Sequence, residues 1–463
     1  MMRCQYEGDT VKKFFYDKIF NKKLISLVIP IAFQQLVLSI VGASDAIMLN
    51  LISQDKMSAV SLATQVTFVE NLFLAAMTIG LSTLAAQYWG KKDTIAVEKI
   101  FAYVTKVTFF VSLMFCLVAL FLPEFLMELL TNEPELVKDG AEYLRLASPS
   151  YLFMGIAQIY LCILKNSGKT AKSTIIGSVC LIGDMIMNII FIPGLFGLPK
   201  LEVAGAALST SIAFALALVW CIIETTKKDS VRLRIHNIIH TDKKLRNDFW
   251  KYTTPVLGNE IVWGVGFTMF SVIMGHLGSD AVAANAVANI VKNLVCCLCI
   301  GLGSGGGIMV GNELGAGHLK KAKAYGDILC KLSVLGGILS GIVLLLLSPI
   351  VLSVADLNAN ATEYLKWMLV ICSYYMIGKS VNSTTIAGIF CAGGDSKFGF
   401  ICDSIVMWGI VVPLGFISAF VLKLPVITVY FIISLDEFCK LPAVYLNYKK
   451  YKWVKDLTIK EER

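Results

Sequence analysis

The sequence predicts an all-α polytopic membrane protein with about twelve transmembrane helices, in two six-helix repeat lobes around a central cavity. Composition is the first reason: 56% of the 463 residues are hydrophobic, only 16% are charged, and mean hydropathy is +0.71. Soluble domains carry about a quarter charged residues. The second reason is a series of apolar runs, each long enough to cross a bilayer, and the third is an internal repeat.

Each expected span is a run of about 20 largely apolar residues, which is the length that crosses the hydrocarbon core as a helix. The runs begin near Leu24, Ser58, Ile100, Val137, Thr174, Val203, Phe249, Ala281, Tyr325, Thr362, Phe398 and Val426. Lys and Arg crowd alternate connections, which predicts that both termini are cytoplasmic and that the protein lies in the cell membrane. The net charge of +8 is therefore a topology signal and does not predict nucleic-acid binding.

An internal repeat appears when the chain is aligned with itself at an offset of 225 positions. The matched pairs are Pro30 with Pro255, Gln34 and Gln35 with Asn259 and Glu260, Gln87 with Asn312, and Gly90 with Gly315. The repeat predicts an N-terminal lobe over 1–226, a basic cytoplasmic linker over 227–248, and a C-terminal lobe with a cytoplasmic tail over 249–463. Parallel repeats of this kind suit alternating access by movement of the lobes.

The first span carries the most unusual combination of residues. It contains a proline, Pro30, and a carboxylate, Asp45, in an otherwise apolar helix. An ionisable residue within a membrane is costly and is by default a functional candidate. Pro30, and Pro255 in the matching helix, predict points at which the helices bend. The amides of Gln34, Gln35 and Asn259 are expected to face the cavity.

Two further groups of polar residues are candidates for ion coupling. Asp184 and Asn188 are one helical turn apart, so with Asp45 they predict an oxygen-rich pocket for a proton or Na⁺. In the second lobe, Glu260, Lys379 and Asp403 fall on three expected spans, either as coupling or substrate residues or as structural ion pairs of Lys379 with Glu260 or Asp403. Asp436, Glu437 and Lys440 are expected to form a polar helix face.

Several other classes of function are disfavoured. Gly168-Lys-Thr170 ends like a phosphate-binding loop, but Ile163 stands where the first glycine of that motif belongs, so no nucleotide cofactor is expected. The 13 cysteines lie mostly in expected spans, where small apolar packing is their ordinary role, and the histidines lack metal-ligand spacing. Apart from Na⁺, no metal is expected. The chain is not expected to be an enzyme.

The order and spacing of short motifs resemble the multidrug and toxic compound extrusion (MATE) family of secondary transporters over nearly the whole chain. The motifs are Pro30, Asp45-Ala-Ile-Met-Leu-Asn50, Ala59-Val-Ser-Leu-Ala63, Gln87-Tyr-Trp-Gly90, Ala204-Gly-Ala-Ala-Leu-Ser-Thr210 and Leu277-Gly-Ser-Asp-Ala-Val-Ala-Ala284.

The resemblance implies an antiporter that exports amphipathic, often cationic compounds in exchange for H⁺ or Na⁺, and we expect it to act as a monomer. Asp45 is similar to the first-helix aspartate of the DinF-like branch, and Thr210 matches the sixth-helix threonine of that branch's cation site. Asp184 and Asn188 match its fifth-helix pair in swapped order. Glu260 is similar to the seventh-helix acid of the NorM-like branch. A lipid-linked oligosaccharide flippase of the same superfamily is the alternative, and a polytopic membrane enzyme is a third reading.

Overall fold

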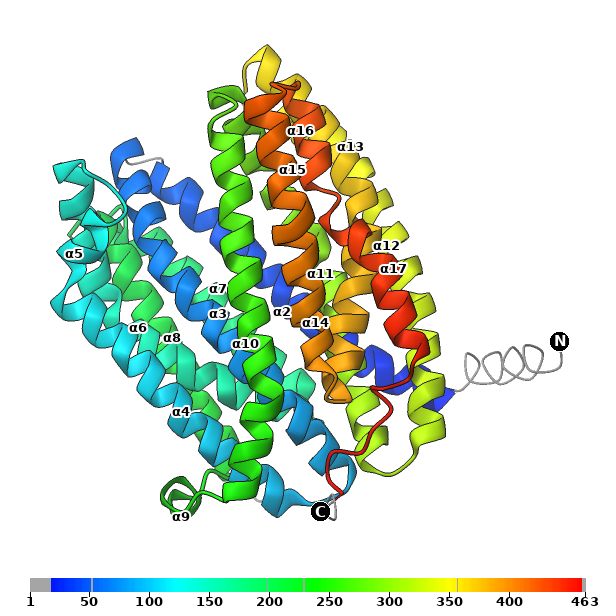
Figure 1. Cartoon of the computed structure of the whole chain (residues 1–463). Coiled ribbons are helices and arrows are strands. Elements are labelled where there is room, and N and C mark those ends of the chain that lie inside the picture. Colours follow the sequence, from blue (N-terminus) through cyan, green and yellow to red (C-terminus); the bar gives the residue numbers. More distant parts are fainter. Residues whose placement is uncertain (1–17, 51–52, 198, 228–229, 356, 460–463) are drawn as a thin grey trace. The chain divides into compact units, whose positions relative to one another are not determined.

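The computed structural model describes residues 18–459 except 51–52, 198, 228–229 and 356. Within helices, the side chains of 45–47, 49–50 and 54 also lie outside the described part. The described backbone is helical with short connections and contains no strand (Figure 1).

The chain divides into two compact units, which are described separately here. The N-terminal unit comprises Val37–Leu81 and Thr94–Phe249, and the C-terminal unit comprises the chain up to Leu36, Ser82–Asp93 and the chain from Trp250 onward. Two long helices therefore contribute residues to both units. The predicted division at 227–248 into two sequential lobes stays a prediction.

The helices of the first half of the chain begin with two long ones. They are α2 (Lys18–Asn50), α3 (Gln54–Gly90), α4 (Thr94–Phe121), α5 (Pro123–Glu128), α6 (Pro134–Asn166), α7 (Thr170–Phe191), η1 (Leu195–Gly197), α8 (Glu202–Thr226) and α9 (Ile235–Ile239). The second half contains α10 (Lys243–Gly275), α11 (Ser279–Gly315), α12 (Leu319–Val354), α13 (Ala359–Asn382), η2 (Ser383–Phe390), α14 (Ser396–Asp403), η3 (Ser404–Val411), α15 (Val412–Phe416), η4 (Ile417–Val421), α16 (Val426–Ile433) and α17 (Asp436–Lys449).

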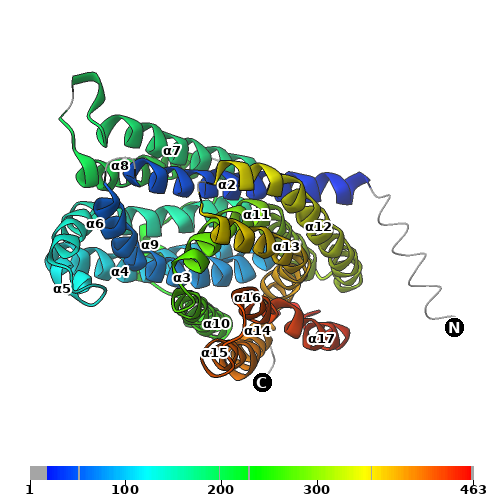
Figure 2. The same ribbon diagram turned by 90° about the horizontal axis from the view of Figure 1, so that it is seen from above.

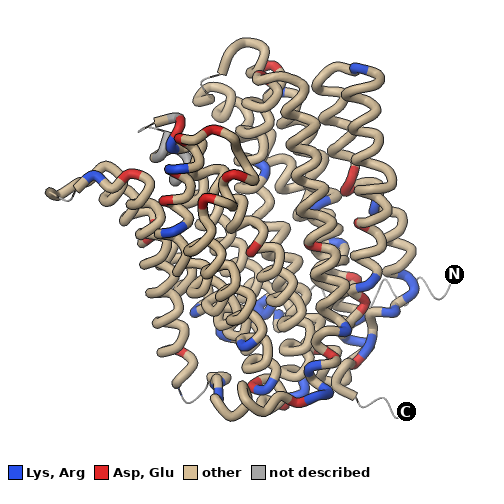
Figure 3. The backbone as a smooth tube through the Cα atoms, turned by 60° about the vertical axis from the view of Figure 1, so that its left-hand side comes forward, with Lys and Arg blue, Asp and Glu red and all other residues tan. Residues whose placement is uncertain are grey.

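Ten helical segments of the described chain are long and apolar enough to cross a membrane. The tenth and twelfth expected spans are the two not among them, and each is divided between two elements, α13 with η2 and α16 with α17. Figure 3 shows long stretches of helix without charge, with a few charged positions away from the helix ends. The prediction of an all-helical membrane protein is confirmed.

The N-terminal unit packs around α6, which contacts both α4 and α8. Its core contains the fully buried Leu144 and Tyr151 of α6. The basic segment after α8 is held against α4, because Arg234 forms an ion pair of 2.8 Å with Glu98 and Lys106 donates to the carbonyl of Ile238 at 3.3 Å. Figure 2 shows α7 running beside α8, consistent with the contacts between these two helices.

In the C-terminal unit, α12 packs closely on α13 through small residues. A Cβ at Gly337 would lie 2.7 Å from the Cα of Ile377, and one at Gly341 would lie 2.4 Å from the carbonyl oxygen of Ser373. Glycines four residues apart let helix backbones approach closely, as is common between membrane helices. Elsewhere, α12 exposes apolar side chains at spacings of three or four residues, which suits contact with lipid: Leu335, Leu339, Ile342, Leu346 and Ile350.

The ends of α3 and α11 cross by a reciprocal contact within the C-terminal unit. A Cβ at Gly90 would lie 2.0 Å from the carbonyl oxygen of Asn312, and a Cβ at Gly315 would lie 1.9 Å from that of Gln87. Gln87 matches Asn312 and Gly90 matches Gly315 at the offset of 225. Two parallel repeats related by a two-fold axis would form a symmetric contact of this kind.

The segment after α17 is held on the same end of the C-terminal unit. The Gln87 side chain accepts a hydrogen bond from the Leu457 amide at 2.7 Å and donates to the carbonyl of Ala392 at 2.7 Å. Trp453 is fully buried and stacks on Tyr448, with ring centroids 5.4 Å apart. The described part of the C-terminal tail is therefore an integral part of the fold.

Candidate functional site

A small pocket inside the C-terminal unit gathers charged side chains from five elements. It has a volume of about 210 Å³ and is formed by α10, α13, η2, α14 and α17. The lining residues are Asn259, Glu260, Trp263, Lys379, Asn382, Ser383, Ile386, Ala387, Asp403, Glu437 and Lys440. Glu260, Lys379 and Asp403, which lie far apart in the sequence, are thus brought together. We call this the C-terminal pocket.

Lys440 lies at the centre of the charges beside this pocket. Its side chain is 3% exposed, and its ammonium is 2.8 Å from Asp403 Oδ1 and 3.9 Å from both Asp436 Oδ2 and Glu437 Oε2. Burial of a charge is tolerated where it is paired with opposite charges. The expectation that Asp436, Glu437 and Lys440 form a polar helix face was wrong, because all three are buried inside the unit.

Lys379 is paired with Glu437 and with neither of the partners expected from the sequence. The distance from Lys379 Nζ to Glu437 Oε1 is 3.1 Å, and the ammonium also lies 5.5 Å from the ring centroid of Trp263. Glu437 accepts a further hydrogen bond of 2.7 Å from Asn382 Nδ2. Asp403 is taken by Lys440, so an ion pair of Lys379 with Asp403 or Glu260 does not form.

Glu260 differs from the other charged residues of the C-terminal pocket. It is partly exposed and forms no ion pair or hydrogen bond through its side chain with any residue in the described part of the chain. The amide oxygen of the preceding residue, Asn259, is buried and also lacks a hydrogen-bond partner. The pocket therefore offers one carboxylate and one amide oxygen that are not engaged by protein groups.

Irregular helix geometry positions the charges of the C-terminal pocket. Asn382 and Asp403 are the last residues before the π-helical segments η2 and η3, and π-helical turns are frequent at functional sites. The twelfth span is interrupted at Ser434–Leu435, so that Asp436 opens the first turn of α17. The positive end of a helix dipole stabilises carboxylates there. Figures 1 and 2 show α14, α16 and α17 gathered together.

The N-terminal unit places the other group of predicted coupling residues on neighbouring helices. Asp184 and Asn188 of α7 are 5% and 1% exposed, and the Ser209 hydroxyl of α8 donates to Asn188 Oδ1. Thr210 is partly exposed and donates to the carbonyl of Ala206 in its own helix at 3.0 Å. Asp45 lies on α2, but its side chain is outside the described residues.

Sequence reasoning missed Ser209, the residue that joins α8 to Asn188. Its position next to Thr210, in a run of small residues, was the available signal. A Cβ at Gly205 would lie 2.9 Å from the backbone carbon of Phe191, so α8 approaches α7 closely at this point. That approach lets a short serine side chain reach across to α7.

The remaining predicted residues lie on the first and seventh spans. Pro30 is inside α2 and Pro255 is inside α10, and both helices continue through their prolines. Gln34 and Gln35 lie on α2 within the C-terminal unit and are partly exposed, and the Gln34 side-chain oxygen is buried without a hydrogen-bond partner. Among the described residues, no three His, Cys, Asp or Glu side chains are grouped as a metal site.

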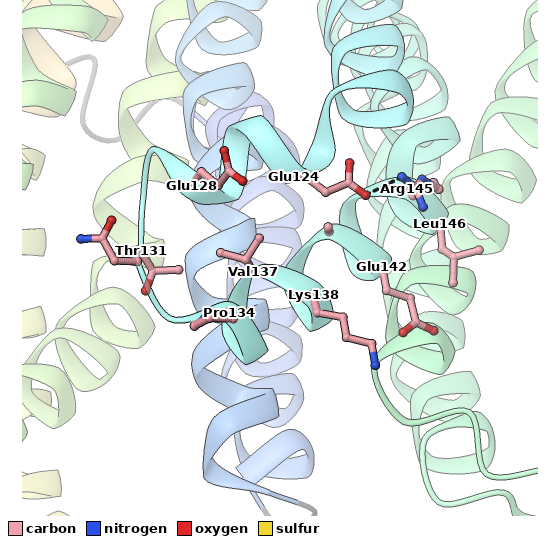
Figure 4. A pocket seen from close by; sticks show the side chains of 11 residues that line it. Glu124, Glu128, Thr131, Pro134, Val137, Lys138, Glu142, Arg145 and Leu146 are labelled. Atoms are coloured by element: carbon pink, nitrogen blue, oxygen red, sulfur yellow. Dashed lines mark hydrogen bonds and ion pairs between the residues drawn. The ribbon is translucent and has the colours of Figure 1, made fainter.

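A second pocket, of about 790 Å³, lies in the N-terminal unit where α5 turns into α6 (Figure 4). Its walls carry Glu124, Glu128 and Glu142 together with Arg145, which pairs with Glu124 at 2.7 Å. Both partners of that pair are about half exposed, so water screens the interaction. None of the predicted site residues lines this pocket.

Comparison with known proteins identifies the family. The MatE family model matches two segments, 30–190 and 255–417, which begin at the two prolines of the repeat. "Uncharacterized transporter YisQ" of Bacillus subtilis is 24% identical over 98% of this chain and 99% of its own length. "Multidrug resistance protein NorM" of Photobacterium profundum is 24% identical over 86% of this chain and 87% of its own.

Solved structures share the fold across almost the whole chain. A variant of the Vibrio cholerae MATE transporter VcmN superposes with a TM-score of 0.86 and 15% identity, covering 96% of this chain and all of that chain. A MOP superfamily transporter of Pyrococcus furiosus gives a TM-score of 0.85 at 15% identity, covering 94% of this chain and 96% of its own. The predicted two-lobe fold of twelve helices is confirmed, and the chain belongs to the MATE family of multi-pass membrane transporters, which are not enzymes.

Proposed function

We propose that this transporter is a secondary active antiporter that exports amphipathic, cationic organic compounds in exchange for H⁺ or Na⁺. It works as a monomer in the cell membrane, with both termini in the cytoplasm. The names of the relatives, which include multidrug resistance proteins, support export of small molecules. Members of the family are coupled to ions in general, so no nucleotide or other cofactor enters the proposal.

The observation that carries this proposal is the unengaged carboxylate of Glu260. In the C-terminal pocket, the ammonium groups of Lys379 and Lys440 are paired with carboxylates, and Glu260 is left without a partner among the described residues. A free carboxylate facing a cavity inside a membrane attracts a cation, whether this is a proton, Na⁺ or the charged group of a substrate. Glu260 is therefore assigned the role of a cation-binding residue.

A second cation site is assigned to the N-terminal unit. Asp184, Asn188 and Ser209 supply carboxylate, amide and hydroxyl oxygens on two adjoining helices, and Asp45 and Thr210 complete the proposed set. Oxygen ligands of this kind suit Na⁺, and either carboxylate can take up a proton instead. Ion binding here would reshape α2 around Pro30, so that ion entry and substrate release exclude one another.

The flippase alternative requires a cavity that attracts the phosphate groups of a lipid-linked sugar. Free lysines or arginines would provide that attraction. Both lysines of the C-terminal pocket are instead committed to carboxylates at 3.1 and 2.8 Å. The charges in this pocket therefore favour export of a cation.

Export of ethidium from proteoliposomes, under an imposed pH or Na⁺ gradient, tests the proposal. Wild type is expected to move ethidium only while a gradient exists, and both Asp45→Asn and Glu260→Gln are expected to lose gradient-driven export. Lys397→Met, an exposed substitution on α14, is the control and should behave as wild type. Unchanged export by Asp45→Asn would contradict the role of the N-terminal site, and unchanged export by Glu260→Gln would contradict that of the pocket.

A further inference from the structure

The N-terminal unit buries another carboxylic acid, Glu70, in the middle of α3. Its residue exposure is 0%, and it lies among α3, α4 and α6, which run together in Figure 1. The Ser112 hydroxyl of α4 donates a hydrogen bond to Glu70 Oε1 at 2.8 Å. The other oxygen, Oε2, is buried and has no hydrogen-bond partner.

No basic side chain balances this acid. Other buried glutamates of the described chain are in ion pairs: Glu98 with Arg234, Glu224 with Lys172 and Lys227, and Glu313 with Lys321. Glu70 forms no ion pair with any described residue. The titratable groups close enough to interact with its charge are the thiol of Cys116 on α4 and the phenol of Tyr151 on α6, neither of which becomes a cation.

The surroundings of Glu70 fit a proton better than a metal ion. A Cβ at Gly155 of α6 would lie 2.0 Å from Ser112 Oγ, so α6 already presses against the hydroxyl that binds the carboxyl. A hydrated or six-coordinate cation needs more room and more oxygen ligands. A proton needs neither, and it converts an expensive buried charge into a neutral donor.

A second polar atom nearby also lacks a partner. Thr108 lies one turn before Ser112 on α4 and borders Gly155 as well, and its hydroxyl oxygen is buried without a hydrogen bond. The interior between these helices thus holds a carboxyl oxygen and a hydroxyl that have unused hydrogen-bonding capacity. Such capacity is rare in folded interiors and commonly marks a group that changes its bonding during function.

We propose that Glu70 is a proton-binding residue of the transport cycle, separate from the Asp45, Asp184 and Asn188 site. The inference rests on the proposed antiport function. Glu70 takes up and releases one proton per cycle while its Oε1 stays bound to Ser112. Because α3 continues from Glu70 into Ser82–Asp93, which belong to the C-terminal unit, a change in how Glu70 is held acts on a helix that both units share.

Infrared spectroscopy on the purified full-length protein tests the proton directly, without transport. A protonated carboxyl group has a carbonyl stretching band distinct from that of a carboxylate, and pH titration should show a band that Glu70→Gln removes. Glu124→Gln, which changes a half-exposed glutamate of the same unit, should leave the band in place. A band that persists in Glu70→Gln overturns the inference.

Ethidium export driven by a pH gradient tests the role in the cycle. Glu70→Gln should lower it on the order of tenfold, within the usual range of coupling between sites, and Glu70→Asp should recover part of the loss. If Glu70→Gln does not fold, Ser112→Ala keeps the carboxyl and should still change the pH dependence of export. A purely structural acid predicts no such change.

The outcomes separate this inference from the proposed function. If wild type exports ethidium under a pH gradient and both Glu70→Gln and Ser112→Ala match it, only the role of Glu70 is overturned. If wild type responds to Na⁺ and not to pH, the role of Glu70 is overturned while antiport stands. A wild type that responds to neither gradient overturns antiport, and the role of Glu70 with it.

Discussion

Replacing Lys440 with methionine removes the cation that holds the buried carboxylates of α14 and α17. The side chains of Asp403 and Asp436 are 8% and 3% exposed, and Lys440 is the ion-pair partner of each. Glu437 keeps Lys379, so the main cost comes from the two aspartates. Breaking a buried pair by removing one partner costs about 3–5 kcal/mol, so Lys440→Met should lower the stability of the C-terminal unit by that amount.

Thermal unfolding followed with a thiol-reactive fluorophore suits this test, because Cys299, Cys391 and Cys402 are buried in the folded unit. The expected loss corresponds to a fall in Tm on the order of 10 °C for a unit of this size. Lys397→Met is the matched control and should change Tm little, because Lys397 is exposed.

The double variant Lys440→Met/Asp403→Asn separates the ion pair from the packing of the lysine. Because it neutralises one of the orphaned carboxylates, it should unfold at a higher temperature than Lys440→Met alone. A Tm for Lys440→Met equal to that of the Lys397→Met control would refute the view that these charges hold the unit together.

The remaining predictions concern packing and one exposed ion pair. Gly90→Val should prevent the close crossing with Asn312 and sharply lower the yield of folded protein, whereas Gly183→Ala, where a Cβ meets nothing within 4 Å, should not. Trp453→Ala should cost about 3–5 kcal/mol in thermal unfolding, because a fully buried ring is removed. Arg145→Ala should cost less than about 1 kcal/mol and leave ethidium export intact, because its pair with Glu124 is half exposed.

The spans and the repeat could be predicted because the bilayer imposes a simple rule on the sequence. A helix must stay apolar for about 20 residues to cross the membrane, so runs such as the one beginning near Val203 mark themselves. The offset of 225 was visible because glycines such as Gly90 and Gly315 are needed where backbones touch. The interruptions at η2 and at Ser434–Leu435 could not be predicted, since they depend on packing between helices.

The site was predicted in part. Glu260, Lys379 and Asp403 were candidates because charge is costly in an apolar span, and they do line one pocket. The choice of partners could not be made from the sequence, because it depends on how α17 packs against α13 and α14. Lys440 was misjudged for the same reason: near the end of the chain, a polar helix face and a buried ion-pair network have the same spacing.

The central claim is that an ion gradient drives substrate across the membrane through this protein, and reversal of the gradient tests it most directly. Purified protein in proteoliposomes should drive ethidium in one direction under an imposed H⁺ or Na⁺ gradient and in the opposite direction when that gradient is inverted. Net movement should stop when an ionophore collapses the gradient. Net movement of ethidium at the same rate and in the same direction under all three conditions would contradict the account.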